Sequence, residues 1–174
     1  MQVIDWQRVV DKYGQMVWRN SYRLLGNHSD AADCFSQTFI SALEISQRKY
    51  IRNISALLAR LATTRAIDLL RQRYRHARFH EEAVDLVFVP SSDSVPLEQI
   101  QAQDLAGQLR KALGQLPPQE AEVFCLRYIN DMSYRQIAAE LDIKTNTAGV
   151  LLHRARVKLR NILEIGPDRN EGAT

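Results

Sequence analysis

The chain has 174 residues, of which 45% are hydrophobic and 25% charged, a composition typical of an ordinary globular protein with one or two domains. Only 7 glycines and 5 prolines interrupt it, and its many Leu, Ala, Arg and Gln residues favour an all-helical fold over a sheet protein. No apolar run approaches the roughly 20 residues that span a bilayer, and the start lacks the pattern of a secretion signal, so we expect a cytoplasmic protein without membrane insertion.

The first half of the chain shows helical spacing of its apolar residues. Three helices are expected, over residues 5–25, about 29–46 and about 54–76. Gly26 suits the end of the first helix, and Ser29 or Asp30 can cap the second. Residues 1–80 are therefore expected to form one helical domain.

The second half begins with a change of composition. Residues 81–96 lose periodicity and contain proline, serine and acidic residues, which is typical of a flexible linker. Helices are expected again over residues 97–115, 119–129, 134–141 and about 145–160, with Pro118 opening the second of these. We predict an all-α fold of two small helical domains, at 1–80 and 97–165, followed by a disordered tail at 166–174.

Charge is distributed unevenly over these segments. Residues 1–80 carry 13 Lys and Arg against 6 Asp and Glu, whereas residues 81–122 carry 2 against 8. Residues 123–174 are basic again, with 8 against 6. Two basic segments around an acidic one suggest two polyanion-binding modules and a connector, although the solvated faces of ordinary helices would also be charged.

The sequence contains no pattern typical of a catalytic or metal site. It lacks a glycine-rich phosphate loop, paired metal-ligating histidines in a suitable setting and a Cys-x-x-Cys motif, so we expect neither enzymatic activity nor a metal or cofactor. Cys34 and Cys125 lie far apart inside helical patterns and are expected to be buried free thiols in a reducing compartment.

The last two expected helices have the features of a helix-turn-helix. Ser133 and Gln136 form a capping-box pattern, Ala138 is the small residue needed at the helix crossing, and Asp142 is placed to take a positive φ in the turn. Apolar residues that would fill the angle between the helices are Ile137, Leu141, Ile143, Ala148 and Leu151. The motif predicts binding of duplex DNA, with the start of the second helix in the major groove.

This packing leaves one set of side chains facing the expected DNA. Thr145 and Asn146 can bond base edges or phosphates, and basic residues farther along suit phosphates. The expected duplex-binding residues are Lys144, Thr145, Asn146, Thr147, Gly149, Val150, His153, Arg154 and Arg156. Lys158 and Arg160 either continue this phosphate-binding row or only complement the dipole of their own helix.

Four blocks of sequence, in this order, resemble one known family. Residues 30–39 and 66–71 resemble sigma-factor region two, and residues 116–128 with 132–138, followed by 153–160, resemble region four. The chain is similar, over most of residues 5–160, to bacterial RNA polymerase sigma factors of the extracytoplasmic-function (ECF) group.

The resemblance implies promoter recognition together with core RNA polymerase. The first domain would dock on the clamp helices of the polymerase β′ subunit and capture melted bases of the −10 element, while the second would meet the β flap and read the −35 element as duplex. An anti-sigma factor is a further candidate partner. Polymerase-binding residues are expected on the polar flank of the second helix, at Asp30, Asp33, Gln37, Ser41 and Glu44. Residues expected to hold the −10 DNA are the arginines Arg60, Arg65, Arg71, Arg75 and Arg78.

The sequence also departs from the family pattern. Ser36 stands where the family commonly has a Gln that precedes an acidic residue, and Gly149 replaces a phosphate-binding lysine, at about 1 kcal/mol in helix propensity relative to Ala. Two alternatives therefore remain open. One is a helix-turn-helix regulator whose N-terminal domain binds a partner or ligand, and the other is a sigma-like protein that binds polymerase without initiating transcription.

Overall fold

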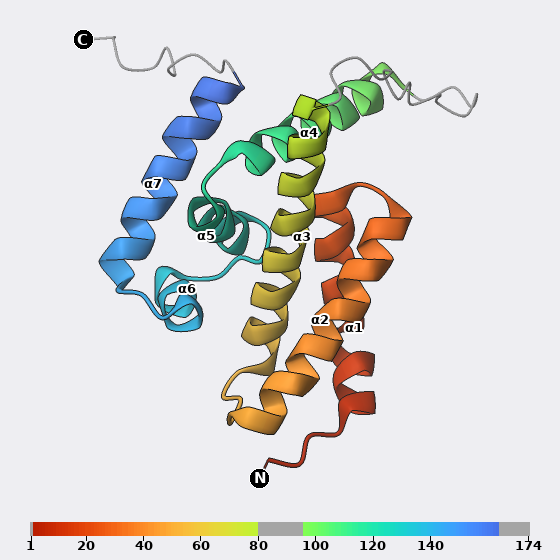
Figure 1. Cartoon of the computed structure of the whole chain (residues 1–174), viewed down its shortest axis with the longest axis vertical. Helices are drawn as coiled ribbons and strands as arrows, with labels where there is room; N and C mark the ends of the chain where they lie inside the picture. Colours follow the sequence, from red (N-terminus) through yellow and green to blue (C-terminus); the bar gives the residue numbers. More distant parts are fainter. Residues whose placement is uncertain (1, 80–95, 164–174) are drawn as a thin grey trace.

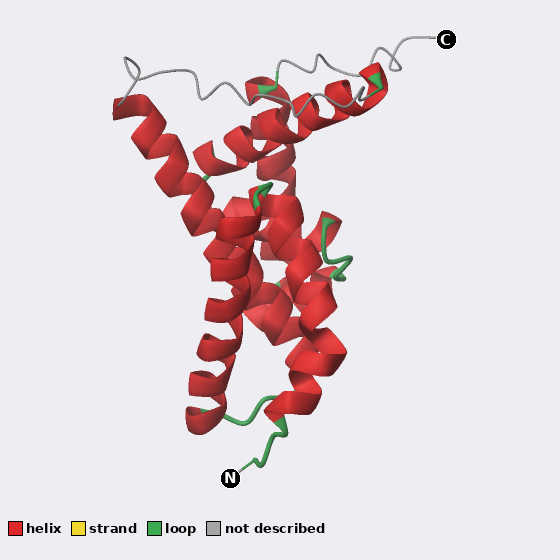
Figure 2. Cartoon of the chain, turned by 90° about the vertical axis from the view of Figure 1, so that its right-hand side faces the viewer, coloured by secondary structure: helices red, strands yellow, loops and turns green. Residues whose placement is uncertain are grey.

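The structure is a computed structural model that describes residues 2–79 and 96–163. These residues form seven α-helices and no strand, as Figures 1 and 2 show from two sides, which confirms the predicted all-α fold. The helices are α1 (Trp6–Leu25), α2 (His28–Arg48), α3 (Ile54–Phe79), α4 (Leu97–Gln115), α5 (Pro118–Tyr128), α6 (Tyr134–Leu141) and α7 (Thr145–Ile162). The predicted linker and tail lie outside the described residues, apart from Pro96, which precedes α4.

Most helix ends follow the local chemistry read from the sequence. Gly26 ends α1 in the left-handed region, with φ 74°, as predicted. The predicted caps of α2 are wrong, because the extended Asn27 takes that place and accepts a bond from the Asp30 N–H at 2.8 Å. Capping of α7 by Thr145 or Asn146 is also wrong, since that helix begins at Thr145 without a side-chain cap.

Helices α1, α2 and α3 form a bundle, here called the N-terminal region. Val17, Ala42, Leu58 and Ala62 are almost fully buried where the three helices meet. Cys34 is a free thiol buried in α2, and burial raises its pKa. One side of α3 packs against α1 and α2 in this bundle. Its other side is left to contact the helices of the second half of the chain.

Helices α4 to α7 form the C-terminal region. Val123 and Leu126 of α5 pack with Ile137 of α6 and with Ala148 and Leu152 of α7 in a buried cluster. Cys125 is fully buried and free, and burial, with a smaller effect of the neighbouring Glu122 carboxylate, raises its pKa to about 12. Both cysteines are therefore the buried free thiols that the sequence predicted.

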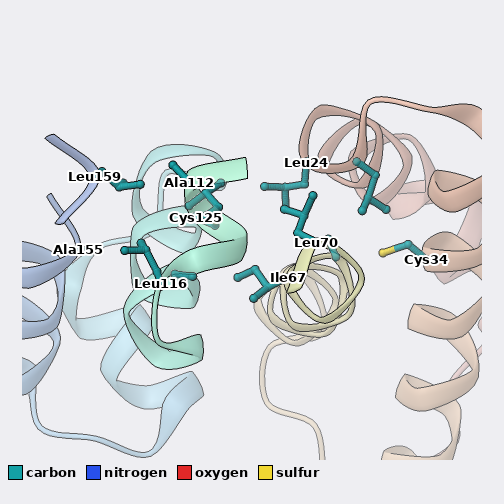
Figure 3. Close-up of a cluster of buried hydrophobic side chains, with 13 residues drawn as sticks. Leu24, Cys34, Ile67, Leu70, Ala112, Leu116, Cys125, Ala155 and Leu159 are labelled. Carbon is teal, nitrogen blue, oxygen red and sulfur yellow. The ribbon is translucent and has the colours of Figure 1, made fainter. Parts of the chain in front are cut away.

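The two regions are packed against each other through α3, which lies between them in Figure 1. Ile67 and Leu70 of α3 share a buried cluster with Leu24 of α1 and with Leu113 and Leu116 of the C-terminal region (Figure 3). From the sequence, residues 1–80, and with them the apolar residues of α3, are expected to form one helical domain. In the structure they point to two sides of the helix, because each region contributes a separate apolar surface.

Candidate nucleic-acid interface

The helix-turn-helix is formed by α6 and α7 with the geometry that the sequence predicted. Ser133 and Gln136 make both bonds of a capping box, at 3.2 and 2.9 Å. Asp142 takes φ 53° in the turn, and Ala138 is buried near the crossing of the helices. A sharp turn and a close crossing hold α7 in a defined orientation on the surface of the C-terminal region.

The predicted duplex-binding face of α7 is uncovered. Every residue predicted for this face is exposed except Gly149, which is half-buried and beside which a Cβ atom would meet nothing within 4 Å. Lys144, Arg154 and Arg156 form no ion pair with any residue that the structure describes. Their charges are free for external anions, and the helix N-terminus adds a positive dipole end beside them.

Lys158 has a different role from its neighbours on α7. Its ammonium group lies 2.9 Å from the carboxylate of Glu120, whose side chain is only 7% exposed. A carboxylate this deeply buried needs a cation close by, and Lys158 supplies it from across the α5–α7 packing. The structure therefore favours an internal role for Lys158 over the phosphate contact that its sequence position offered.

The five arginines predicted to hold −10 DNA do not form one free row. Arg75 and Arg78 are exposed at the end of α3, with the Arg78 guanidinium 5.9 Å from the centre of the Tyr74 ring. Arg65 instead pairs with Asp33 of α2 at 3.0 Å.

The two remaining arginines of this set contact the C-terminal region. The Arg60 Nε atom lies 3.4 Å from a carboxylate oxygen of Glu140 in α6. The Arg71 guanidinium donates to the backbone carbonyl of Leu116 at 2.7 Å. Both guanidinium groups therefore bind partners within the chain. The spacing of residues within α3 could not predict these partners, because both lie far along the sequence.

The predicted polymerase-binding side chains follow the outer side of α2. Gln37 and Glu44 are exposed and Ser41 is half-buried. Asp30 pairs with Arg73 and accepts a bond from Asn27, and these two hydrogen bonds lower its pKa. Arg73, which was not among the predicted site residues, also donates to the Leu25 carbonyl at 2.9 Å and so ties α3 to both neighbouring helices. Asp33 and Arg65, assigned to different partners, touch each other.

Sequence reasoning missed a basic cavity of about 490 Å³ between the α2–α3 connection and α6. Arg48, Lys49 and Arg52 line it beside Tyr50, whose side chain is 75% exposed. Cations interleaved with an exposed aromatic ring suit single-stranded nucleic acid, which is held by charge and base stacking. The signal in the sequence is the run of cations around Tyr50, at Arg48, Lys49 and Arg52.

A half-buried carboxylate, that of Glu122, lies where α5 packs on α3. Burial is the largest influence on Glu122 and raises its pKa; a hydrogen bond with Thr64 and the charge of Arg60 act in the opposite direction, and Asp68 raises it further. Asp68 forms no ion pair within the described ranges. Glu122 of α5 therefore contacts Thr64 of α3, across the packing of the two regions.

Within the described residues, no helix is both long and apolar enough to cross a membrane. The same ranges contain no cluster of three or more His, Cys, Asp or Glu residues arranged to hold a metal ion.

An exposed recognition helix and a second basic, aromatic surface on one helical chain define a DNA-binding protein of the helix-turn-helix class. Residues 9–76 match the family model of Sigma-70 region 2, and residues 106–159 match that of Sigma-70, region 4. The chain therefore belongs to the sigma-70 family, in its ECF group.

Two curated relatives carry names of the same group. The ECF RNA polymerase sigma factor SigE of Mycolicibacterium smegmatis is 32% identical over 159 residues, which cover 91% of this chain and 62% of the relative. The ECF RNA polymerase sigma factor SigW of Bacillus subtilis is 29% identical over 162 residues, covering 89% of this chain and 87% of the relative. The chain thus spans less than two thirds of SigE but most of SigW.

Two solved structures share the fold. The sigma factor RpoE in complex with the anti-sigma factor NepR from Bartonella quintana aligns with a TM-score of 0.56 and 20% identity, over 95% of this chain and all of the other. CnrH in complex with the cytosolic domain of CnrY aligns with a TM-score of 0.59 and 21% identity, over 93% of this chain and 89% of the other. At these identities the likeness concerns the arrangement of helices.

Proposed function

We propose that this protein is a non-enzymatic sigma factor of the ECF type, acting in the cytoplasm without a cofactor. It binds core RNA polymerase and directs promoter recognition, DNA melting and the start of transcription. The observation that carries this proposal is the uncovered recognition face of α7 on the same chain as a region-2 bundle. A regulator of the helix-turn-helix class would need the motif alone, so the alternative is not favoured.

The −35 element is assigned to α7 and the turn before it. Asn146 and Thr145 lie at the start of the helix, where this motif places side chains against base edges. Arg154 and Arg156 are exposed and unpaired within the described residues, which suits phosphate contacts on either side of the groove.

The −10 element is assigned to the arginines of α3 and to the basic cavity beside Tyr50. Melted DNA offers phosphates to the guanidinium groups and an unstacked base to the aromatic ring. Polymerase is assigned to the outer side of α2, where Gln37 and Glu44 leave polar groups exposed beside a buried face. Because one of the two similar structures is a complex with an anti-sigma factor, and the other is a complex with a protein's cytosolic domain, we further propose that a protein inhibitor binds this chain.

The test is in vitro transcription from genomic fragments, with core RNA polymerase and with or without this protein, followed by mapping of start sites. The protein should create new start sites that share −35 and −10 sequences. Duplex binding without polymerase, together with failure to bind the core enzyme, would favour a regulator instead.

A charge-reversal pair tests the −10 assignment. Arg75→Glu should reduce open-complex formation, measured by permanganate reactivity of unpaired thymines, while binding to core polymerase stays intact. Arg8→Glu is the matched control, since Arg8 is exposed on α1 and its side chain forms no ion pair with described residues. If Arg75→Glu reduced core binding as much as open-complex formation, this part of α3 would contact polymerase, and its assignment to −10 DNA would be wrong.

A further inference from the structure

We propose that a polar cavity between α1, the start of α3 and the turn from α5 to α6 binds a small phosphorylated ligand of the nucleoside diphosphate class. This cavity is separate from the basic cavity beside Tyr50, although Asn53 lines both. The inference goes beyond the proposed function, because it concerns a small molecule and the cations that would bind it are not assigned to polymerase or to promoter DNA.

The cavity has the size and the mixed lining of a small-molecule site. Its volume is about 330 Å³, and sites for small ligands begin at about 300 Å³. Its apolar lining comes from Met16, Ala56, Ala59, Ile129 and Met132, of which the two alanines and Met132 are buried. Methionine side chains adapt to the shape of a flat ring, so this lining suits the base of a nucleotide.

Two cations without partners line the same cavity. Arg19 and Arg23 are exposed and lie one turn apart on α1, and neither guanidinium forms an ion pair or hydrogen bond with any described residue. Like charges at this spacing repel each other, and an anion between them removes the repulsion. Phosphate oxygens match the planar fork of a guanidinium group, so a phosphate is the anion that this pair fits.

Two side-chain amides in the cavity are left with donors only. The Asn53 carbonyl oxygen accepts from the Ala56 N–H at 3.0 Å, and the Gln136 carbonyl oxygen accepts from the Ser133 N–H at 2.9 Å. These bonds fix the orientation of both amides, and neither NH₂ group donates to a described residue. The cavity therefore offers two amide donors beside the two guanidinium groups, which favours a ligand with several charged oxygens.

Among the described residues that line this cavity, Asp131 carries the only carboxylate. Its backbone has φ 56°, and it forms no ion pair within the described part of the chain. The preceding residue, Asn130, donates to the Thr63 hydroxyl at 3.3 Å and accepts from Asn20, which is only 5% exposed. The turn is thereby held in place. A carboxylate repels a bare phosphate but accepts hydrogen bonds from the hydroxyl groups of a ribose, so Asp131 favours a nucleoside phosphate over an inorganic one.

The experiment is calorimetric titration of the full chain, in magnesium-free buffer, with ADP and separately with pyrophosphate. We expect one ADP to bind per chain, more tightly than pyrophosphate. ADP should also raise the midpoint of thermal unfolding as its concentration increases, because the cavity exists only in the folded chain.

Charge removal tests the phosphate contacts. Arg19→Met and Arg23→Met should each weaken binding of both ligands by roughly tenfold or more, since each variant loses hydrogen bonds to a charged group. Arg8→Met is the matched control, because Arg8 is exposed on the same helix, is unpaired within the described residues and does not line the cavity. It should bind both ligands as the parent chain does.

Asp131→Asn separates the two ligands. Asparagine also accepts a left-handed backbone, so the turn is preserved. The variant should weaken ADP binding by about fivefold, through the lost ribose contact, and tighten pyrophosphate binding, through the lost repulsion.

Three results would overturn the inference. The first is absence of ADP binding at millimolar concentration, and the second is ADP binding that neither Arg19→Met nor Arg23→Met weakens. The third is a change in the same direction for both ligands in Asp131→Asn, which would reduce the cavity to a site for simple anions. Displacement of ADP by a short single-stranded oligonucleotide that loses affinity in the same arginine variants would assign the surface to a DNA backbone instead. None of these results depends on whether the chain supports transcription.

Discussion

Gly149 gives the sharpest test of the DNA-facing side of α7. It lies in the second turn of the helix, its backbone is helical, and a side chain there would meet only open space. Gly149→Ala should therefore raise the free energy of unfolding by about 0.5–1 kcal/mol, because Ala loses less backbone freedom than Gly in a helix. A long side chain at this position would lie beside Asn146 and His153, three residues before and four residues after it on the exposed face.

The effect of charge at this position can be worked out for Gly149→Lys. One additional phosphate contact steepens the dependence of log K on log salt by about 0.9. Between 50 and 200 mM salt this slope lowers affinity by a further factor of about 3.5. Gly149→Gln provides a side chain of similar helix propensity without the charge, so the difference between Lys and Gln isolates the phosphate contact.

The assay is binding of the polymerase holoenzyme to a promoter fragment with a −35 element, repeated across that salt range. The Lys variant should bind more tightly than the Gln variant at low salt and lose the advantage as salt rises. Equal slopes for the two variants would show that position 149 does not face the DNA backbone, and the assignment of this face of α7 would be wrong.

Two further predictions concern the carboxylates of Glu122, which is half-buried, and Glu120, which is buried. Because burial raises the pKa of Glu122 above its ordinary 4.5, the contribution of this group to folding is largest at low pH and is lost as pH rises through the raised pKa. The free energy of unfolding should fall over this range, and Glu122→Gln should abolish that part of the dependence; an unchanged profile would show that Glu122 is not responsible for it. Lys158→Met should lower the free energy of unfolding by about 1–3 kcal/mol, since it leaves the Glu120 carboxylate without its cation. Arg160→Met, at an exposed position without an ion pair among the described residues, should stay within about 0.5 kcal/mol in the same denaturation experiment, and equal losses would refute the internal role of Lys158.

The sequence by itself determined the features that depend on residues close together in the chain. Helix periodicity predicted the positions of the seven helices that the described residues form, and the capping box at Ser133 and the left-handed turn at Asp142 followed from local backbone chemistry. The uncovered face of α7 followed as well, because filling the angle between two adjacent helices leaves a defined set of residues outside. The caps of α2 and α7 were wrong, since several nearby residues could serve and local preference does not choose among them.

Only the tertiary structure decided which surface each side of α3 meets. Apolar residues such as Leu58 and Ile67 look alike in the sequence, yet the first packs inside the N-terminal bundle and the second contributes to the cluster shared with the C-terminal region. The same holds for Arg60, which reads as a free cation until Glu140, 80 positions along the chain, is placed beside it. Burial and ion pairing depend on distances between residues far apart in sequence. Periodicity within one helix therefore identifies a buried face without identifying its partner.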